Sequence, residues 1–230
     1  MGREEPEREA APSLDALIDR RADHLKASRA ESEAKRYRTL VERVRAAETK
    51  AGLGETLTAA AARSYHRLLA VKDEWEVARL FAAPEFARAL AEEFEGPFKI
   101  HFHIGAWPFA RPDPRTGVMG KGEAGPWAMA AFRLMARLRF LRGSLLDPFR
   151  NSDERKLERS LIAEFEADID DLVRRLAPGT HALAIRIASL PETIKGYGRV
   201  KEASAAEAGK ARANALQQLR AAKPPMELAA

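Results

Sequence analysis

The stretch TLTAAAARSYHRLLAVKDEWEVARLF, residues 56–81, carries the strongest periodic signal in the chain. Six of its side chains recur at alternating steps of four and three residues, the spacing that places side chains on one stripe of a helix. They are Ala61, Tyr65, Leu68, Lys72, Trp75 and Arg79. Other apolar residues fall on the remaining faces, which is typical of a buried helix. We therefore expect one central helix from Thr56 to Phe81, ended by Pro84.

Helical spacing of apolar residues also precedes and follows this stretch. Residues 13–50 predict a helical hairpin or one long interrupted helix, with Ser13 as its N-cap. Further helices are expected at residues 85–95, 126–142, 152–177, 180–190 and 200–220, with Ser152 and Thr180 as the N-caps of the third and fourth. Within the 126–142 helix, the apolar repeat predicts a buried stripe. It consists of Trp127, Leu134, Leu138 and Leu141.

Residues 98–104 follow a different period. Phe98, Ile100, Phe102 and Ile104 alternate with the polar residues Lys99, His101 and His103. This alternation predicts a strand with one buried face, and the residues 113–117 that follow have the composition of a tight turn. We expect a β-hairpin over residues 98–124. A lone hairpin is marginally stable in water, so this one should lie on helices or on another subunit.

The predicted fold class is therefore mainly α (α+β), a multi-helix domain with one small β-hairpin. Residues 1–12 alternate Arg and Glu with proline and predict a disordered leader. Residues 13–222 are expected to form a single helical domain, and residues 223–230 a frayed tail.

Composition excludes several classes of protein. Among 230 residues, 39 Lys and Arg stand against 34 Asp and Glu, so a net charge of +5 permits an acidic partner without requiring one. The chain has no cysteine, which rules out disulfides, thiolate catalysis and cysteine-held metal clusters. No apolar run approaches the roughly 20 residues of a membrane span, and the first residues do not resemble a secretory signal. We expect a cytoplasmic protein.

Catalytic sequence signatures are missing from the chain. It contains no phosphate-binding loop, no nucleophile elbow and no zinc-protease motif. His101 and His103 share a strand face, but a catalytic zinc needs three protein ligands and the neighbouring sequence offers no third. We interpret them as the polar face of the hairpin, and we expect the chain to bind no metal or cofactor of its own.

Charged residues crowd the second half of the central helix. Lys72, Asp73, Glu74, Glu76 and Arg79 flank Trp75, and buried charges of this kind need partners. One interpretation is an internal ion-pair network at a domain boundary, built from pairs such as Lys72–Glu76 and Glu76–Arg79. The other is a surface that docks on another protein, formed with His101 and His103 of the hairpin. Trp75 and Arg79, four residues apart, could stack.

Residues 133–159 form the most basic region. Its cations are Arg133, Arg137, Arg139, Arg142, Arg150, Arg155, Lys156 and Arg159. Acidic residues are interspersed and no nucleic-acid recognition motif accompanies them. A solvated face or an acidic protein partner therefore fits this region better than nucleic acid.

Four segments, taken in order, resemble the C-terminal domain of bacterial indolepyruvate ferredoxin oxidoreductases. They are YHRLLAVKDEWEVARL (65–80), KIHFHI (99–104), LRGSLLDPF (141–149) and GYGRVKE (196–202), and Gly125-Pro126-Trp127 fits as well. The resemblance spans about Ser13 to Arg220, and four ordered segments are more specific than any one of them.

The resemblance implies that the chain is a non-catalytic part of a large enzyme. That family decarboxylates aryl 2-oxoacids oxidatively to acyl-CoA and passes the electrons to ferredoxin, with thiamine diphosphate and iron–sulfur clusters held in other domains. The implied partners are those catalytic domains and, indirectly, ferredoxin. Since Met1 stands where catalytic domains would precede, we expect a split-off subunit or a gene fragment. A free-standing interaction module is the alternative.

Overall fold

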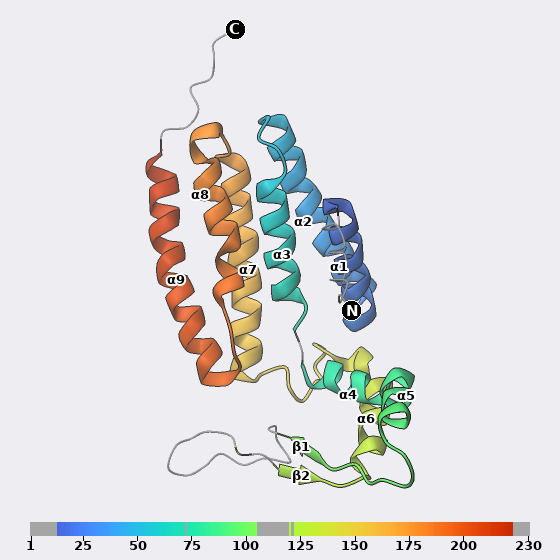
Figure 1. Cartoon of the computed structure of the whole chain (residues 1–230). Coiled ribbons are helices and arrows are strands. Elements are labelled where there is room, and N and C mark those ends of the chain that lie inside the picture. The colour runs from blue at the N-terminus through green and yellow to red at the C-terminus, as the bar shows by residue number, and fades with distance from the viewer. Residues whose placement is uncertain (1–12, 72, 105–119, 121, 223–230) are drawn as a thin grey trace, which may run out of the picture. The chain divides into compact units, whose positions relative to one another are not determined.

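The structure is a computed structural model that describes residues 13–71, 73–104, 120 and 122–222. The predicted leader (1–12), the predicted turn (113–117), the predicted tail (223–230) and Lys72 lie outside these residues. The described part of the chain contains nine α-helices, two short 3₁₀ helices and one pair of antiparallel strands (Figure 1). The predicted fold class, mainly α with one small pair of strands, is confirmed.

Residues 13–222, expected to form one domain, group into two compact units. Unit 1 comprises residues 1–71 and 151–230, and unit 2 comprises residues 72–150. The chain thus leaves unit 1 after residue 71, within the predicted central helix, and returns to it at residue 151, before the C-terminal helices.

Unit 1 is a helical bundle assembled from both ends of the chain. Its elements are α1 (Leu14–Ser28), α2 (Glu31–Lys50), α3 (Thr56–Leu69), α7 (Asp153–Arg174), α8 (Pro178–Ser189), the 3₁₀ helix η2 (Leu190–Thr193) and α9 (Gly198–Ala221). Helix α3 packs against α2 on one side and α8 on the other (Figure 1). Because α3 is surrounded by helices, nine of its fourteen residues are buried, as its alanine-rich and leucine-rich faces predict.

Side-chain caps set the helix starts in unit 1 where the sequence predicts them. The Ser13 hydroxyl accepts a hydrogen bond from the Ala16 amide at 3.2 Å, and Ser152 accepts one from Arg155 at 3.3 Å. Thr180 behaves differently. Helix α8 begins at Pro178, so Thr180 lies inside the first turn, where its hydroxyl accepts from the Ala177 amide at 3.0 Å.

Unit 2 is smaller and mixes helices with the two strands. Its elements are α4 (Glu74–Ala82), α5 (Pro84–Glu93), β1 (Phe102–Ile104), β2 (Gly122–Ala124), α6 (Ala128–Arg137) and the 3₁₀ helix η1 (Arg139–Leu141). The strands pair antiparallel with Phe102 opposite Ala124, so the predicted strand is real but shorter than residues 98–104. Phe102 is buried and packs edge-on against Phe81 and Phe132 with ring centroids about 5 Å apart. This aromatic cluster is the core of unit 2.

The predicted central helix over residues 56–81 is wrong as one continuous element. Helix α3 ends at Leu69 and α4 begins at Glu74. The reason is Asp73, whose carboxylate accepts a hydrogen bond from the Glu76 amide at 2.8 Å and so caps a new helix. The stripe of side chains that appeared continuous in the sequence is therefore split between the two units.

The predicted buried stripe of α6 is also wrong. Trp127 and Leu134 are exposed, whereas Ala128 and Phe132 are the buried residues of this helix. Helix α6 packs against α4, and Ala78 of α4 belongs to the same cluster as Phe132. Trp127 and Leu134 of the predicted stripe therefore lie at the surface of unit 2, whereas Leu138 and Leu141 are half-buried.

Candidate functional site

The charged residues at the start of α4 form an ion-pair network inside unit 2. Asp73, 3% exposed, accepts a hydrogen bond from the Arg142 guanidinium at 2.7 Å in addition to capping α4. The Arg79 guanidinium donates two hydrogen bonds to the buried Glu76 carboxylate, at 2.7 and 2.8 Å. This pairing raises the pKa of Arg79 above its usual value. Glu74 is half-buried in the first turn of the helix.

Trp75 is buried within this network rather than presented to a partner. Its indole N–H donates to the Asp147 carboxylate at 3.2 Å, and its ring meets Phe149 edge-on at 6.1 Å. Arg79, the residue expected to stack on Trp75, instead donates to the Glu76 carboxylate. Trp75 thus links α4 to the segment that follows η1. Two of the four segments that carry the family resemblance, residues 65–80 and 141–149, meet here.

The segment after η1, residues 143–149, is a loop ordered by a single carboxylate. Asp147 accepts hydrogen bonds from the Gly143 amide at 2.7 Å and from the Phe149 amide at 3.0 Å, besides the Trp75 indole. Gly143 adopts a φ of +75°, which a residue with a side chain rarely tolerates. The Ser144 hydroxyl accepts from the Leu146 amide at 3.1 Å. We call residues 143–149 the Asp147 loop.

The Asp147 loop presents two leucine side chains to solvent. Leu145 is 89% exposed and Leu146 is 74% exposed, although the Leu146 amide donates to the Ser144 hydroxyl and Asp147 holds the loop at Gly143 and Phe149. Burying a leucine side chain is favourable by about 1.5–3 kcal/mol relative to leaving it exposed. An ordered loop that keeps two leucines exposed is therefore characteristic of a binding surface.

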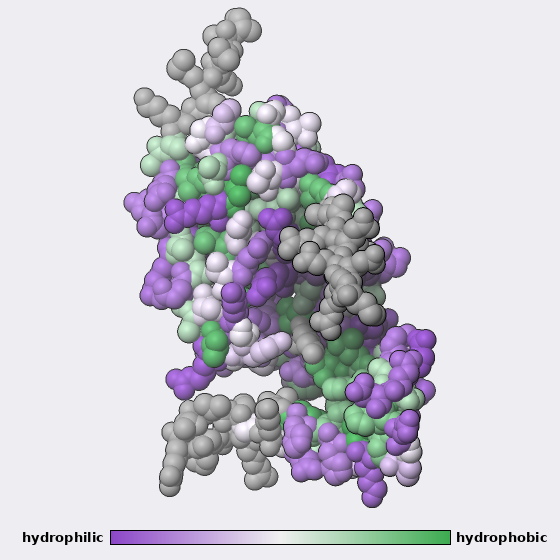
Figure 2. Space-filling view, viewed as in Figure 1, coloured by the Kyte–Doolittle hydropathy of each residue, from purple (hydrophilic) through white to green (hydrophobic). Residues whose placement is uncertain are grey.

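Unit 2 as a whole carries most of the exposed large apolar side chains in the described part of the chain. Eight of the ten belong to it: Leu80, Phe94, Phe98, Trp127, Leu134, Phe140, Leu145 and Leu146. In Figure 2, hydrophobic residues come to the surface among hydrophilic ones on the unit that holds α4 to α6. Single exposed apolar residues are ordinary, but their concentration in the smaller unit indicates an interaction surface.

The two strand histidines lie on the exposed face of the strand pair. His101 Nδ1 is 2.6 Å from a carboxylate oxygen of Glu123, and His103 lies opposite Glu123 in the strand register. Glu123 is the neighbour that the sequence did not reveal, since it comes from the second strand. Among the residues that the structure describes, no group of three or more His, Asp or Glu is placed to hold a metal ion.

Unit 1 buries a carboxylate at the start of α3. Glu48, on α2, is fully buried and accepts hydrogen bonds from the Leu57 and Thr58 amides at 2.7 and 2.8 Å. It also accepts one from the Thr58 hydroxyl at 2.7 Å, and its carboxylate lies 2.7 Å from His181 Nε2. Burial alone would raise the pKa of Glu48, but the hydrogen bonds from Thr58, His181 and Leu57 outweigh it and lower the pKa.

A second polar cluster of unit 1 surrounds Tyr65. Its hydroxyl donates to Glu166, which also accepts two hydrogen bonds from Arg36 at 2.7 and 2.9 Å. Burial and the Glu166 hydrogen bond raise the pKa of Tyr65 far above its usual value. The neighbouring His66 has its pKa lowered to about 4, first by burial and then by Arg21 and His24. Each of these groups is held by internal partners, which indicates a structural role.

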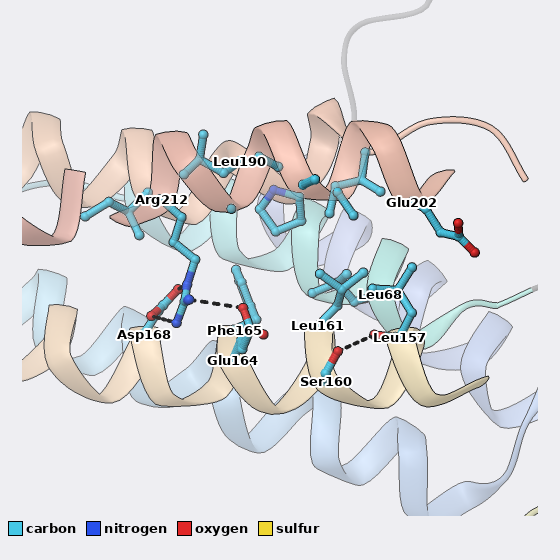
Figure 3. Close-up of a pocket in the computed structure, with 17 residues that line it drawn as sticks. Leu68, Leu157, Ser160, Leu161, Glu164, Phe165, Asp168, Leu190, Glu202 and Arg212 are labelled. Carbon is cyan, nitrogen blue, oxygen red and sulfur yellow. Dashed lines mark hydrogen bonds and ion pairs between the residues drawn. The ribbon is translucent and has the colours of Figure 1, made fainter. Parts of the chain in front are cut away.

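Unit 1 also contains a pocket of about 290 Å³ between α7 and α9 (Figure 3). Its lining is mainly apolar and comes from Leu68, Leu157, Leu161, Phe165, Ile187, Leu190, Pro191, Ile194, Ala205, Ala206, Ala208 and Gly209. Its polar lining residues are Ser160, Glu164, Asp168, Glu202 and Arg212. Arg212 reaches across from α9 to Asp168 and Glu164 on α7 at one end, and Glu202 lies at the other end (Figure 3). Sequence spacing did not predict this pocket.

Residues 14–214 match the model of a family of unknown function, DUF6537. Comparisons with curated proteins and with solved structures find no significant match. Within the described ranges, no helix combines the length and the apolar character that crossing a membrane requires.

Proposed function

Because the chain belongs to the DUF6537 family, whose function is unknown, we propose its role from the surface of unit 2 and from the four sequence segments that resemble an oxidoreductase. We propose that the chain is a non-catalytic accessory domain that docks on the catalytic domains of a 2-oxoacid ferredoxin oxidoreductase in the cytoplasm. The reaction of that enzyme would be oxidative decarboxylation of aryl 2-oxoacids to acyl-CoA. Thiamine diphosphate, CoA and iron–sulfur clusters would be held by the catalytic domains.

The proposed docking role rests on one observation, the two exposed leucines of the Asp147 loop. Its two leucines are exposed on a backbone that Asp147 has already ordered, so little conformational entropy would be lost when a partner covers them. The buried residues Asp73, Trp75 and Glu76, predicted as interface residues, serve in this proposal to hold the loop. Direct contact would fall to exposed residues around them.

The choice of partner rests on the resemblance. Segments 65–80 and 141–149, which the resemblance singles out, meet through the Trp75–Asp147 hydrogen bond. In this proposal, residues that resemble segments of a family of large enzymes build the loop that presents the exposed leucines. An interaction module that has left the enzyme would use the same loop with another partner, and it is the alternative.

Nucleic acid fits the structure less well. Arg142, in the basic region, donates to the buried Asp73, and Arg155 pairs with Glu158. Cations that neutralise internal carboxylates contribute less to the binding of phosphates.

Titration of the chain against the separately purified catalytic domains tests the proposal. The double variant Leu145→Ser/Leu146→Ser should weaken association by about 100-fold or more, since it removes two apolar side chains worth about 1.5 kcal/mol or more each when buried. Val200→Ser, the same kind of change at an exposed position of unit 1, is the matched control and should leave affinity unchanged. Equal affinities for all three proteins, or no association of the wild type, would refute the proposal.

A further inference from the structure

The pocket of unit 1 lies between two levels of ion pairs that join α7 and α9. At one level Lys201 donates to Glu158 at 2.6 Å, and at the other Arg212 donates to Asp168 at 2.7 Å. Arg212 follows Lys201 by eleven positions, which span about 16.5 Å of helix at 1.5 Å per residue. The pocket is therefore an elongated space with charged groups at its ends.

The size of the α9 side chains explains why this space is open. Where α7 contributes Leu157, Leu161 and Phe165, the stretch of α9 between Glu202 and Arg212 lines the pocket with three alanines and Gly209. A Cβ atom added at Gly209 would meet nothing within 4 Å. Protein interiors are normally close-packed, so an apolar space of this volume, bounded by ordered helices, could hold a small guest.

The hydrogen-bonding groups around the pocket indicate the charge of that guest. Arg212 directs three of its five N–H groups at carboxylates, two at Asp168 and one at Glu164, so most of its donor capacity is used inside the protein. The Ser160 hydroxyl donates to the Leu157 carbonyl at 2.8 Å. The unused hydrogen-bonding capacity of these groups is therefore mostly that of acceptor oxygens. Glu202 makes no ion pair with any residue that the structure describes. A guest with a donor group and a positive charge fits this inventory.

We propose that this pocket binds an elongated apolar molecule that carries one ammonium group. Its apolar chain would lie along Leu157, Leu161 and Phe165, and its ammonium group would meet Glu202 at the end away from Arg212. The lining carboxylates outnumber the lining cation by three to one, so a carboxylate-bearing guest of the same length would be repelled. This inference goes beyond the docking role and does not depend on it.

Calorimetric titration with octylammonium and with octanoate, both below the concentrations at which they aggregate, tests the proposal on the full chain. Octylammonium should bind at one site with a Kd on the order of 0.1–1 mM, as expected for a ligand of its size. Octanoate should bind at least tenfold more weakly. Glu202→Gln should weaken octylammonium binding about fivefold and should strengthen octanoate binding, because it removes one of the carboxylates that repel octanoate.

Gly209→Leu and Gly209→Ala form a matched pair for locating the site. Leucine would fill the pocket and abolish binding, whereas alanine should keep most of it. Both replace a helical glycine by a better helix former, so both variants should melt at or above the wild-type temperature. Equal affinity for the two probes, undiminished binding by a folded Gly209→Leu variant, or no saturable binding at all would overturn the proposal.

Discussion

Replacement of Asp147 by alanine perturbs the loop on which the docking role depends. The carboxylate accepts hydrogen bonds from the Gly143 amide, the Phe149 amide and the Trp75 indole. The amides lie near solvent and can turn to water, so losing their bonds should cost about 0.5–1 kcal/mol each. The indole N–H belongs to a side chain that is 95% buried, and leaving it without an acceptor should cost about 1–3 kcal/mol.

Together these losses amount to about 2–5 kcal/mol, which corresponds to about 30- to 5000-fold in the equilibrium for opening unit 2. Asp147→Asn is the matched control. Its side-chain oxygen can still accept from Trp75 and Phe149, so only the Gly143 bond is lost and the effect should be about 1 kcal/mol.

Amide hydrogen exchange, followed peptide by peptide, is the suitable assay because it measures the two units separately in one sample. Protection in residues 73–82 and 139–149 should fall in the order wild type, Asn variant, Ala variant. Amides of unit 1 should change little, since every bond removed lies in unit 2. Unchanged protection in the Ala variant, or equal losses in both variants, would refute the assignment of Asp147 as the organiser of the loop.

Three further predictions concern stability and activity. Glu48→Gln should lower the free energy of unfolding of unit 1 by about 3 kcal/mol at pH 7. Because folding lowers the pKa of Glu48, this difference should shrink as the pH falls below the unfolded pKa of about 4.3. A pH-independent difference in urea titrations would contradict this prediction. His66→Leu should flatten the loss of stability as the pH falls from about 6.5 to about 4, the window in which only the unfolded chain protonates His66; an unchanged slope would argue against this. The isolated chain should not decarboxylate indolepyruvate when supplied with thiamine diphosphate, CoA and an electron acceptor, and turnover by homogeneous protein would show that it is catalytic.

Local signals in the sequence predicted the elements well where a single residue determines the outcome. Ser13 and Ser152 cap helices as expected, and the alternation around Phe102 marks a true strand. The periodicity does not show the break before α4, because Asp73 lies among other charged residues that fit one continuous helix. An aspartate three residues before Glu76 is also a cap signal, and it could have located the break.

Long-range contacts explain what the sequence did not reveal. The spacing of Trp127 and Leu134 predicts a buried stripe, but only the position of α4 determines which face of α6 is covered. The partner of Trp75 lies 72 residues away, so no periodicity could identify Asp147. The pocket beside Gly209 likewise depends on the spacing of α7 and α9, which composition does not encode.

Hydrogen exchange of the chain with and without the catalytic domains of a 2-oxoacid ferredoxin oxidoreductase measures the central claim most directly. If unit 2 docks through the Asp147 loop, binding should slow exchange in residues 139–149 and in adjoining parts of α4, and leave helices α1, α2 and α9 of unit 1 unchanged. Slowed exchange confined to unit 1, or no difference at saturating concentrations of the catalytic domains, would contradict the claim.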